Sequence, residues 1–190
     1  DNAAALLEPA GIALHTFNLL NLEYGSKIAI VGAGPIGLST AIYSKKMGMI
    51  PILIDTVEYR NNFAKSLGFA AASPSMMVNH DSGFDATIDA AGDAESFNLC
   101  TKLCKKSGTT AIVGIPNSDY IHINPHTMRI KELKIQNIRR ANQTLHHCIN
   151  HFENDSYLLD KMVTHIFDLE KAQEAFELVS KKKDRVIKCM

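Results

Sequence analysis

The sequence lacks several features that would point to particular classes of protein. It has no tryptophan and no excess of charge of either sign, because 20 Lys and Arg residues balance 20 Asp and Glu residues over 190 positions. A balanced charge gives no reason to expect a nucleic-acid partner or a role at a membrane surface. We find no signal peptide, and we expect no apolar run of membrane-spanning length.

Cysteine is also scarce. The four cysteines form neither a Cys-x-x-Cys pair nor a dense framework, and they are Cys100, Cys104, Cys148 and Cys189. Reduced thiols and a cytoplasmic location are the simplest interpretation. Because two sulfurs do not make a zinc site, we expect Cys100 and Cys104 to be buried structural thiols on one helix face. His147 and His151 have metal-ligand spacing but no third ligand nearby, so we expect a solvated helix face there.

The most informative stretch is a glycine-rich turn between two regular elements. An apolar run, 28–31, precedes Gly32-Ala33-Gly34-Pro35-Ile36-Gly37, and a helical pattern follows up to Gly48. In such a motif the first glycine allows a sharp turn, the second allows a pyrophosphate to approach the backbone, and the third allows close helix packing. The free N–H groups at the helix start favour phosphate. We therefore predict a dinucleotide site at Gly32, Gly34, Pro35, Ile36 and Gly37.

An acidic residue follows at the expected distance. Asp55 closes the second apolar run, 51–54, and lies 18 residues beyond Gly37. A carboxylate there accepts both ribose hydroxyls of an adenosine and repels a 2′-phosphate, which favours NAD over NADP. Arg60, at the start of the next predicted helix, is either a solvated side chain or a second contact to the adenosine.

The remaining pattern predicts an α/β fold with a doubly wound, six-stranded parallel sheet, the Rossmann fold. The six expected strands are residues 28–31, 51–54, 69–72, 84–89, 109–115 and 131–138. Small residues after the fourth strand, Ala90, Ala91 and Gly92, suit the close approach of a ligand. The segment 73–83 is too short for an ordinary crossover helix.

Several polar residues leave two interpretations open. Glu8 precedes Pro9 in an apolar helix, 3–22, and is either an exposed boundary residue or a carboxylate facing an active-site cleft, with His15 two turns on. Arg139 and Arg140 are either surface charge or contacts for a hydroxyl-rich ligand. Residues 120–123 are a candidate edge strand, which would favour a homodimer or homotetramer.

The two ends of the sequence indicate a piece of a longer protein. The chain begins without Met inside a predicted helix, and it ends in a strand-like segment, 186–190, without a partner nearby in sequence. A strand at 163–167 and a helix at 169–180 precede this segment. The helix repeats Ala172, Ala175, Phe176 and Val179 at helical spacing.

The order and spacing of several blocks resemble the medium-chain dehydrogenase/reductase superfamily, in its zinc-dependent sorbitol (polyol) dehydrogenase-like branch. The blocks span nearly the whole chain and read EPAGIALH, IAIVGAGPIGL, FDATIDAAG, AIVGIP, KELKIQNIRR and VTHIFDLEKAQEAFELV. The resemblance implies that residues 1–190 form the NAD-binding domain of a longer enzyme. It further implies that about 1–22 and about 181–190 pack against an N-terminal GroES-like domain that holds zinc.

The resemblance also implies roles for individual residues. Ile36 and Gly37 would meet the pyrophosphate, Asp55 and Arg60 the adenosine, and Ala90 to Gly92 would line the cleft. Residues flanking the nicotinamide would be Val113, Gly114, Ile115, Ile138 and Arg139. Arg139 would also reach toward substrate hydroxyls, and Glu8 would lie beside the zinc or its water.

The zinc ligands of such enzymes have no counterpart in this sequence. The resemblance does not fix the substrate, an alcohol or polyol, because sorbitol, xylitol, threonine, butanediol and sugar-acid dehydrogenases share these blocks. A zinc-free reductase of the quinone or enoyl type has the same fold, although Asp55 argues against its usual NADPH. A stand-alone nucleotide-binding module without catalysis is a further alternative. The isolated chain is expected to bind NAD and to catalyse nothing.

Overall fold

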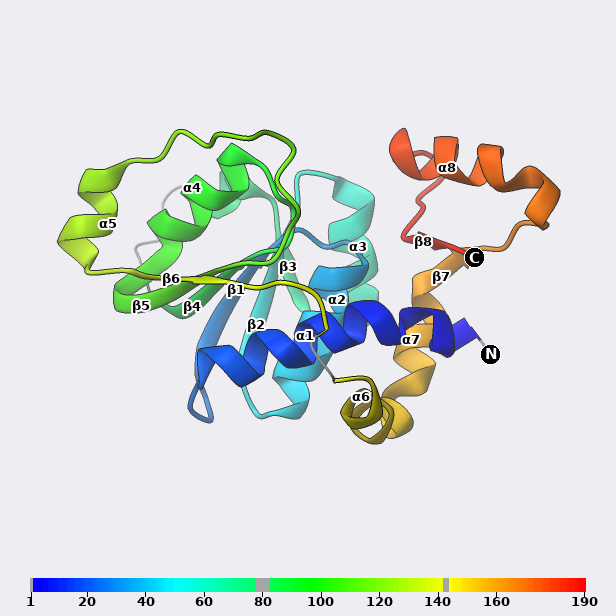
Figure 1. Ribbon diagram of the computed structural model, residues 1–190, viewed down its shortest axis with the longest axis horizontal. Coiled ribbons are helices and arrows are strands. Elements are labelled where there is room, and N and C mark those ends of the chain that lie inside the picture. The colour runs from blue at the N-terminus through cyan, green and yellow to red at the C-terminus, as the bar shows by residue number, and fades with distance from the viewer. Residues whose placement is uncertain (1, 78–82, 142–143) are drawn as a thin grey trace.

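Six parallel strands form the centre of the molecule in the computed structural model, which describes residues 2–77, 83–141 and 144–190. Their order across the sheet is β3-β2-β1-β4-β5-β6 (Figure 1). The strands are β1 Lys27–Val31, β2 Ile50–Ile54, β3 Ala70–Ala72, β4 Phe84–Asp89, β5 Cys104–Ile112 and β6 Lys134–Asn137. This order is that of a dinucleotide-binding Rossmann fold, so the predicted fold class is confirmed.

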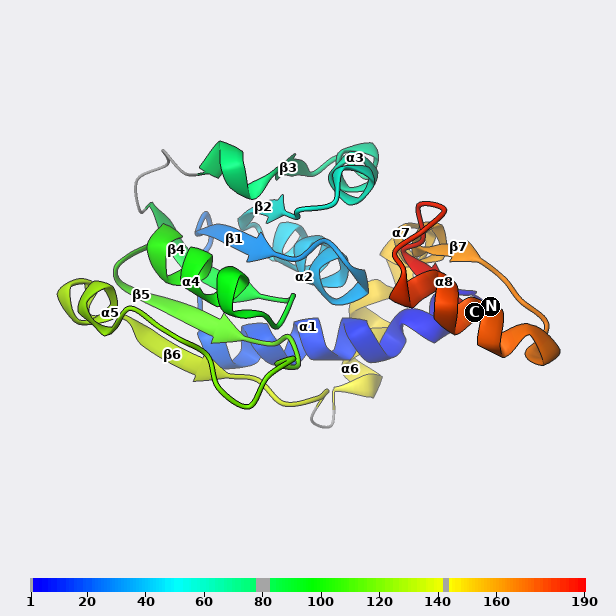
Figure 2. The same cartoon turned by 90° about the horizontal axis from the view of Figure 1, so that it is seen from above.

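Helices cover both faces of this sheet. On one face lie α1 (Leu7–Leu20), α2 (Pro35–Lys46) and α3 (Glu58–Ser66); α4 (Ala94–Leu103) and α5 (Pro125–Lys131) lie on the other (Figures 1 and 2). The short 3-10 helix η2 (Pro74–Met77) occupies part of the polar segment after β3. Residues 78–82 of that segment lie outside the described residues.

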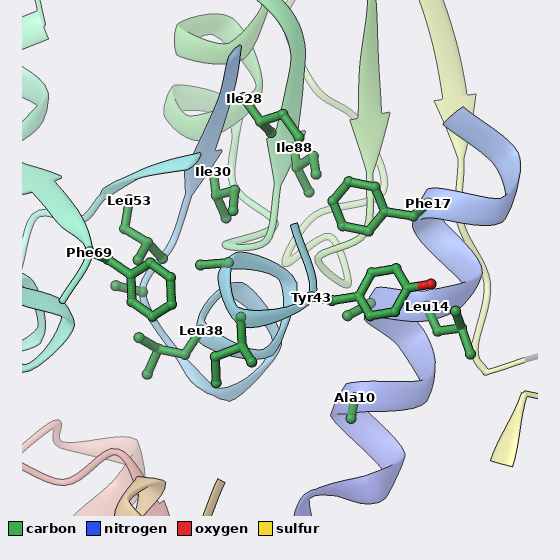
Figure 3. Packing of buried hydrophobic residues seen from close by; sticks show 14 of the residues in the cluster. Ala10, Leu14, Phe17, Ile28, Ile30, Leu38, Tyr43, Leu53, Phe69 and Ile88 are labelled. Atoms are coloured by element: carbon green, nitrogen blue, oxygen red, sulfur yellow. The ribbon is translucent and has the colours of Figure 1, made fainter. Parts of the chain in front are cut away.

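The alternation of side chains along β1 divides the core into two layers. Ile28 and Ile30 belong to the cluster beneath α1 and α2, whereas Ala29 and Val31 belong to the cluster beneath α4. Figure 3 shows Ile30 pointing from β1 toward α2, and Tyr43 of α2 lying beside Phe17 and Leu14 of α1. Each fully buried isoleucine contributes roughly 1.5–3 kcal/mol. The continuous apolar runs in the sequence therefore reflect strands covered on both faces.

The first helix is long and apolar. The stretch Asn2–Leu20, which combines η1 (Asn2–Leu6) with α1, could cross a membrane by length and composition, so the expectation that no run reaches that length is wrong. Half of it is buried inside the protein, as is typical of a core helix in a soluble protein. The Phe17 and Tyr43 rings lie 5.4 Å apart between α1 and α2. This contact explains why the helix is apolar on more than one side.

The C-terminal part of the chain forms a small lobe beside the sheet (Figure 2). It contains α6 Leu145–Phe152, η3 Glu153–Asp155, α7 Ser156–Met162, β7 Val163–His165, η4 Leu169–Lys171, α8 Ala172–Ser180 and β8 Lys188–Cys189. The final strand, β8, finds its partner across η4 and α8, since it pairs in parallel with β7.

Several predicted elements end elsewhere or are absent. The helix expected at 93–106 stops at Leu103, and β5 starts at Cys104. Residues 120–123 are in no strand of the described chain. Instead α5 follows, with Asn124 Oδ1 accepting from the Thr127 N–H at 3.1 Å and Pro125 at the first helical position. This is a usual helix start, which the apolar pattern concealed.

Two sets of apolar side chains are less buried than the sequence pattern predicts. Met47, an apolar residue of the helical pattern that runs up to Gly48, is 44 % exposed just beyond the last turn of α2. On α8, Phe176 is 74 % exposed and Val179 is 41 % exposed. The helical repeat of α8 therefore faces away from the core of the described chain.

Candidate functional site

A cavity of about 1210 Å³ lies at the carboxyl ends of the central strands. Its walls come from the segments that follow β1, β2 and β4 together with η2, one side of α4 from Ala94 to Lys102, His122 and Lys182. The chain leaves β1 toward β2 on one side, while β4 lies on the other side of β1. This reversal of strand order is where open α/β sheets bind their ligands.

The glycine turn after β1 is held in one conformation. Gly32 has φ 108°, which disfavours any side chain, and its N–H donates to the Ile54 carbonyl at 2.7 Å. A Cβ on Gly37 would come within 1.8 Å of the Gly32 carbonyl oxygen. In contrast, a Cβ on Gly34 would meet nothing within 4 Å. The turn is thus closed on the protein side at Gly37 and open on the cavity side at Gly34.

Helix α2 begins at this open point. Gly34 is the N-cap and Pro35 occupies the first turn, where a missing N–H costs little. Leu38 donates to the Gly34 carbonyl at 2.9 Å, which leaves the earlier N–H groups of Ile36 and Gly37 without a helical acceptor. These groups and the helix dipole make the helix start attractive to an anion.

Asp55 joins the end of β2 to the glycine turn. Its Oδ2 accepts from the Ala33 N–H and its Oδ1 from the Val57 N–H, each at 2.8 Å. Arg60 Nη1 lies 3.7 Å from Oδ2, and Asp55 is only 7 % exposed. A carboxylate has about four lone-pair positions, so acceptor capacity remains for hydroxyl donors in the cavity.

Asp89 fixes the third wall of the cavity, although sequence analysis gave it no role. Its Oδ1 accepts from the Ala91 and Gly92 N–H groups at 3.0 Å each and from Ser96 Oγ at 2.8 Å. Burial raises the pKa of the Asp89 carboxyl, since the charged form loses its hydration. Its position at the end of β4, like that of Asp55 at the end of β2, was a signal available in the sequence.

The predicted cofactor residues fall into two groups. Those that line the cavity are Gly32, Gly34, Pro35, Asp55, Arg60, Ala90 and Ala91. Ile36 and Gly37 lie just behind, in the first turn of α2. Gly92 and Gly114 are buried against each other, since a Cβ on Gly114 would lie 2.4 Å from the Gly92 nitrogen.

The residues assigned to the nicotinamide end do not line this cavity. Val113 is buried and Ile138 partly buried, whereas Ile115 is 88 % exposed and Arg139 is also exposed. Glu8 is exposed in the first turn of α1. The cavity therefore gathers the adenosine and pyrophosphate candidates, and the nicotinamide and catalytic candidates lie outside it. Lys182, which does line it, was not predicted because it is distant in sequence.

No group of three or more His, Cys, Asp or Glu side chains arranged for a metal ion occurs within residues 2–77, 83–141 and 144–190. His151 packs edge-on against Tyr43, with ring centres 5.3 Å apart. All four cysteines are free, and Cys100 and Cys104 are buried as expected. The expectation that the two share a helix face is wrong, because α4 ends at Leu103 and Cys104 begins β5.

The strand order and the glycine turn place this protein among the dinucleotide-binding α/β domains. The family model described as zinc-binding dehydrogenase matches residues 35–154. The chain therefore belongs to the zinc-binding dehydrogenase family.

Individual relatives agree with this assignment. The chain is 28 % identical over 197 residues to a sorbitol dehydrogenase of Bacillus subtilis, covering 98 % of this chain and 56 % of the relative. A solved Escherichia coli oxidoreductase/dehydrogenase of unknown specificity is 29 % identical with a TM-score of 0.87, over 97 % of this chain and 55 % of that one.

A zinc-binding dehydrogenase of Sinorhizobium meliloti, solved with NADP bound, is 25 % identical with a TM-score of 0.82, over 91 % of this chain and 54 % of that one. The chain thus spans about half the length of the relatives that it matches.

Proposed function

We propose that this chain is the NAD-binding part of a zinc-dependent alcohol or polyol dehydrogenase, which transfers a hydride from a secondary alcohol to NAD. The family assignment and the half-length match to a sorbitol dehydrogenase support the proposal. The observation that carries it is the hydrogen bond between the glycine turn after β1 and the carboxylate after β2. Asp55 Oδ2 accepts from Ala33 in the glycine turn, so the phosphate-binding and ribose-binding groups form one rigid unit.

The residues fit a dinucleotide without rearrangement. Space beside Gly34 admits the pyrophosphate, and the Ile36 and Gly37 N–H groups donate to its oxygens. Asp55 accepts hydrogen bonds from the ribose hydroxyls, and Arg60 covers the adenosine from the side. Ala90 and Ala91 present no side chain beyond Cβ, so the cofactor can lie close to the loop after β4.

The bound nicotinamide supplies the hydride acceptor, and zinc held by the rest of the enzyme supplies the Lewis acid. In this proposal Gly92, Val113, Gly114, Ile115 and Ile138 shape the nicotinamide end. Arg139 donates to substrate hydroxyls, and Glu8 lies beside the zinc or its water. These roles require a preceding GroES-like domain, which the greater length of the relatives supports. This chain orients the cofactor and by itself should not oxidise a polyol.

The test is direct binding of NADH to the chain and to Asp55→Ala. Loss of two charge-assisted hydrogen bonds should weaken binding by roughly ten- to a hundredfold. Asp119→Ala, in the exposed segment 116–124, removes the same charge elsewhere and should leave binding unchanged. Equal NADH affinity of the wild type and Asp55→Ala would refute the role of Asp55. Polyol oxidation by the isolated chain would refute the proposal that this chain only orients the cofactor.

We further propose a cytoplasmic homodimer or homotetramer. The four free thiols are compatible with a reducing compartment. The described residues 120–123 form no edge strand, but Tyr120 is 85 % exposed, which supports a face for a second copy. Sedimentation of the full-length enzyme tests this, and a monomer at micromolar concentration would contradict it.

A further inference from the structure

The turn between α8 and β8 brings one lysine to the dinucleotide cavity. Residues 181–185 carry four basic side chains, but of these only Lys182 lines that cavity. Lys181 is paired with Glu177 at 2.8 Å on α8, and Arg185 lines a separate cavity of about 420 Å³ beside α3. Within the described residues, no carboxylate pairs with the Lys182 ammonium group.

The turn is attached to α3 and not to the glycine turn. Tyr59 Oη donates to the Val186 carbonyl at 2.9 Å, and Val186 and Ile187 are 1 % and 3 % exposed. Asp184 Oδ2 lies 3.2 Å from His165 Nε2, which ties the turn to β7. Figure 2 shows the turn next to α3. Lys182 lines the same cavity as Asp55, Thr56 and Arg60. Its turn is hydrogen-bonded to Tyr59, the residue before Arg60 on α3.

The three charged side chains Asp55, Arg60 and Lys182 carry a net positive charge, which favours an anion. Asp55 provides one negative charge, already shared among two backbone N–H groups and Arg60. Arg60 and Lys182 provide two positive charges. Asp55 can accept from a 2′-hydroxyl, whereas the two cations can bind a phosphate attached at that position.

We propose that Lys182 is a specificity-determining residue that, with Arg60, lets the adenosine end of the cleft accept a 2′-phosphate, so that the domain binds NADPH as well as NADH. This inference rests on the proposed dinucleotide function of the same cavity. In this proposal Lys182 contacts the 2′-phosphate and not the pyrophosphate, because its turn is hydrogen-bonded to α3. Since the ammonium group is solvated, its contribution is modest and decreases with salt.

The experiment is a titration of the chain with NADH and with NADPH, followed by nicotinamide fluorescence, for the wild type, Lys182→Gln and Lys181→Gln. Lys181→Gln is the matched control, since it removes the same charge from the same turn but at a side chain engaged by Glu177. Lys182→Gln should weaken NADPH binding by roughly three- to tenfold while NADH binding changes by less than about twofold. Thermal unfolding of the three proteins verifies that each is folded.

The outcomes separate the two proposals. If the wild type binds NADH and Lys182→Gln leaves the NADPH affinity unchanged, the inference is overturned. The proposed function then remains intact. Equal weakening of both cofactors would also overturn it, because Lys182 would then act on a group that both share. Binding of neither cofactor to the wild type would contradict the proposed function and this inference together. A selective loss of NADPH binding, reduced further at high salt, supports it.

Discussion

Two aspartates at strand ends shape the cleft through the loops that follow them. Asp55 holds Ala33 and Val57, and Asp89 holds Ala91 and Gly92. The Asp89 main-chain carbonyl also accepts from the Val113 and Gly114 N–H groups at 2.9 and 2.8 Å. One residue thus connects the loops after β4 and β5. Asp89 Oδ2 is buried without a partner in the described chain, which makes its ionised form costly.

Asp89→Asn should change how the free energy of unfolding depends on pH. The folded carboxyl binds its proton more tightly than the unfolded one, because burial raises its pKa. Its stabilisation is therefore complete below the ordinary aspartate pKa and is lost as pH rises through the raised value. Asn keeps an Oδ1 acceptor but cannot ionise, so the variant should gain stability relative to wild type as pH rises through this range. Denaturant unfolding at a series of pH values measures the difference.

Asp119→Asn, in the exposed segment 116–124, is the control and should follow the wild type at every pH. If the free energy of unfolding of the wild type and of Asp89→Asn changed in parallel with pH, Asp89 would have the same pKa in the folded and the unfolded chain.

The junction between α4 and β5 depends on a lysine from another helix. Lys131, at the end of α5, donates from Nζ to the carbonyls of Thr101 at 3.1 Å and Cys104 at 2.9 Å, and to Lys102. These carbonyls belong to the last turn of α4 and the first residue of β5, where no helical donor remains. Burial lowers the pKa of the Lys131 ammonium group. The early end of α4 at Leu103 therefore has a tertiary cause.

Lys131→Met should destabilise the protein by about 1–3 kcal/mol, because it leaves these carbonyls without a charged donor. Denaturant unfolding at neutral pH measures the loss. Lys106→Met, at an exposed position of β5, preserves these bonds and should change stability by no more than roughly 0.5 kcal/mol. Equal effects of the two substitutions would contradict the role of Lys131.

The whole molecule consists of the Rossmann sheet and a C-terminal lobe that returns to its cofactor side. The two are joined by few polar contacts. Tyr59 donates to Val186, and Lys46 Nζ pairs with Asp155 Oδ2 at 2.9 Å. The exposed side chains of η4 and α8, with Leu169 86 % and Phe176 74 % exposed, add no packing against the sheet. Cys148, Phe152, Leu159 and Met162 of α6 and α7 belong to the same core cluster as the sheet. Residues 163–189 of the lobe should therefore open at a lower free energy than the sheet.

Tyr59→Phe removes the hydroxyl that holds Val186 and should lower the free energy of lobe opening by about 1 kcal/mol. Hydrogen exchange of residues 163–189 should become faster, while exchange in β1 and β4 stays unchanged. Tyr157→Phe is the matched control, since this exposed ring on α7 is 57 % accessible. Unchanged exchange in the lobe of Tyr59→Phe would mean that apolar packing alone attaches it.

The sequence pattern predicted those elements correctly whose structure depends on neighbouring residues alone. The run Ile28 to Val31, the glycines after it and Asp55 have fixed roles in a strand–turn–helix unit, and they lie where the sequence placed them. The pattern was insufficient at residues 120–123, where apolar alternation predicted a strand. Asn124 and Pro125 instead begin a helix, and no partner strand lies alongside.

The sequence by itself determined the Rossmann fold, the glycine turn and the acid that faces it, because these depend on residue type and spacing within one βαβ unit. The tertiary structure alone decided the end of α4, the pairing of β7 with β8 and the approach of Lys182 to the cleft. Each of these depends on a contact between segments far apart in the chain. Such contacts form only when the core has packed, so no local pattern encodes them.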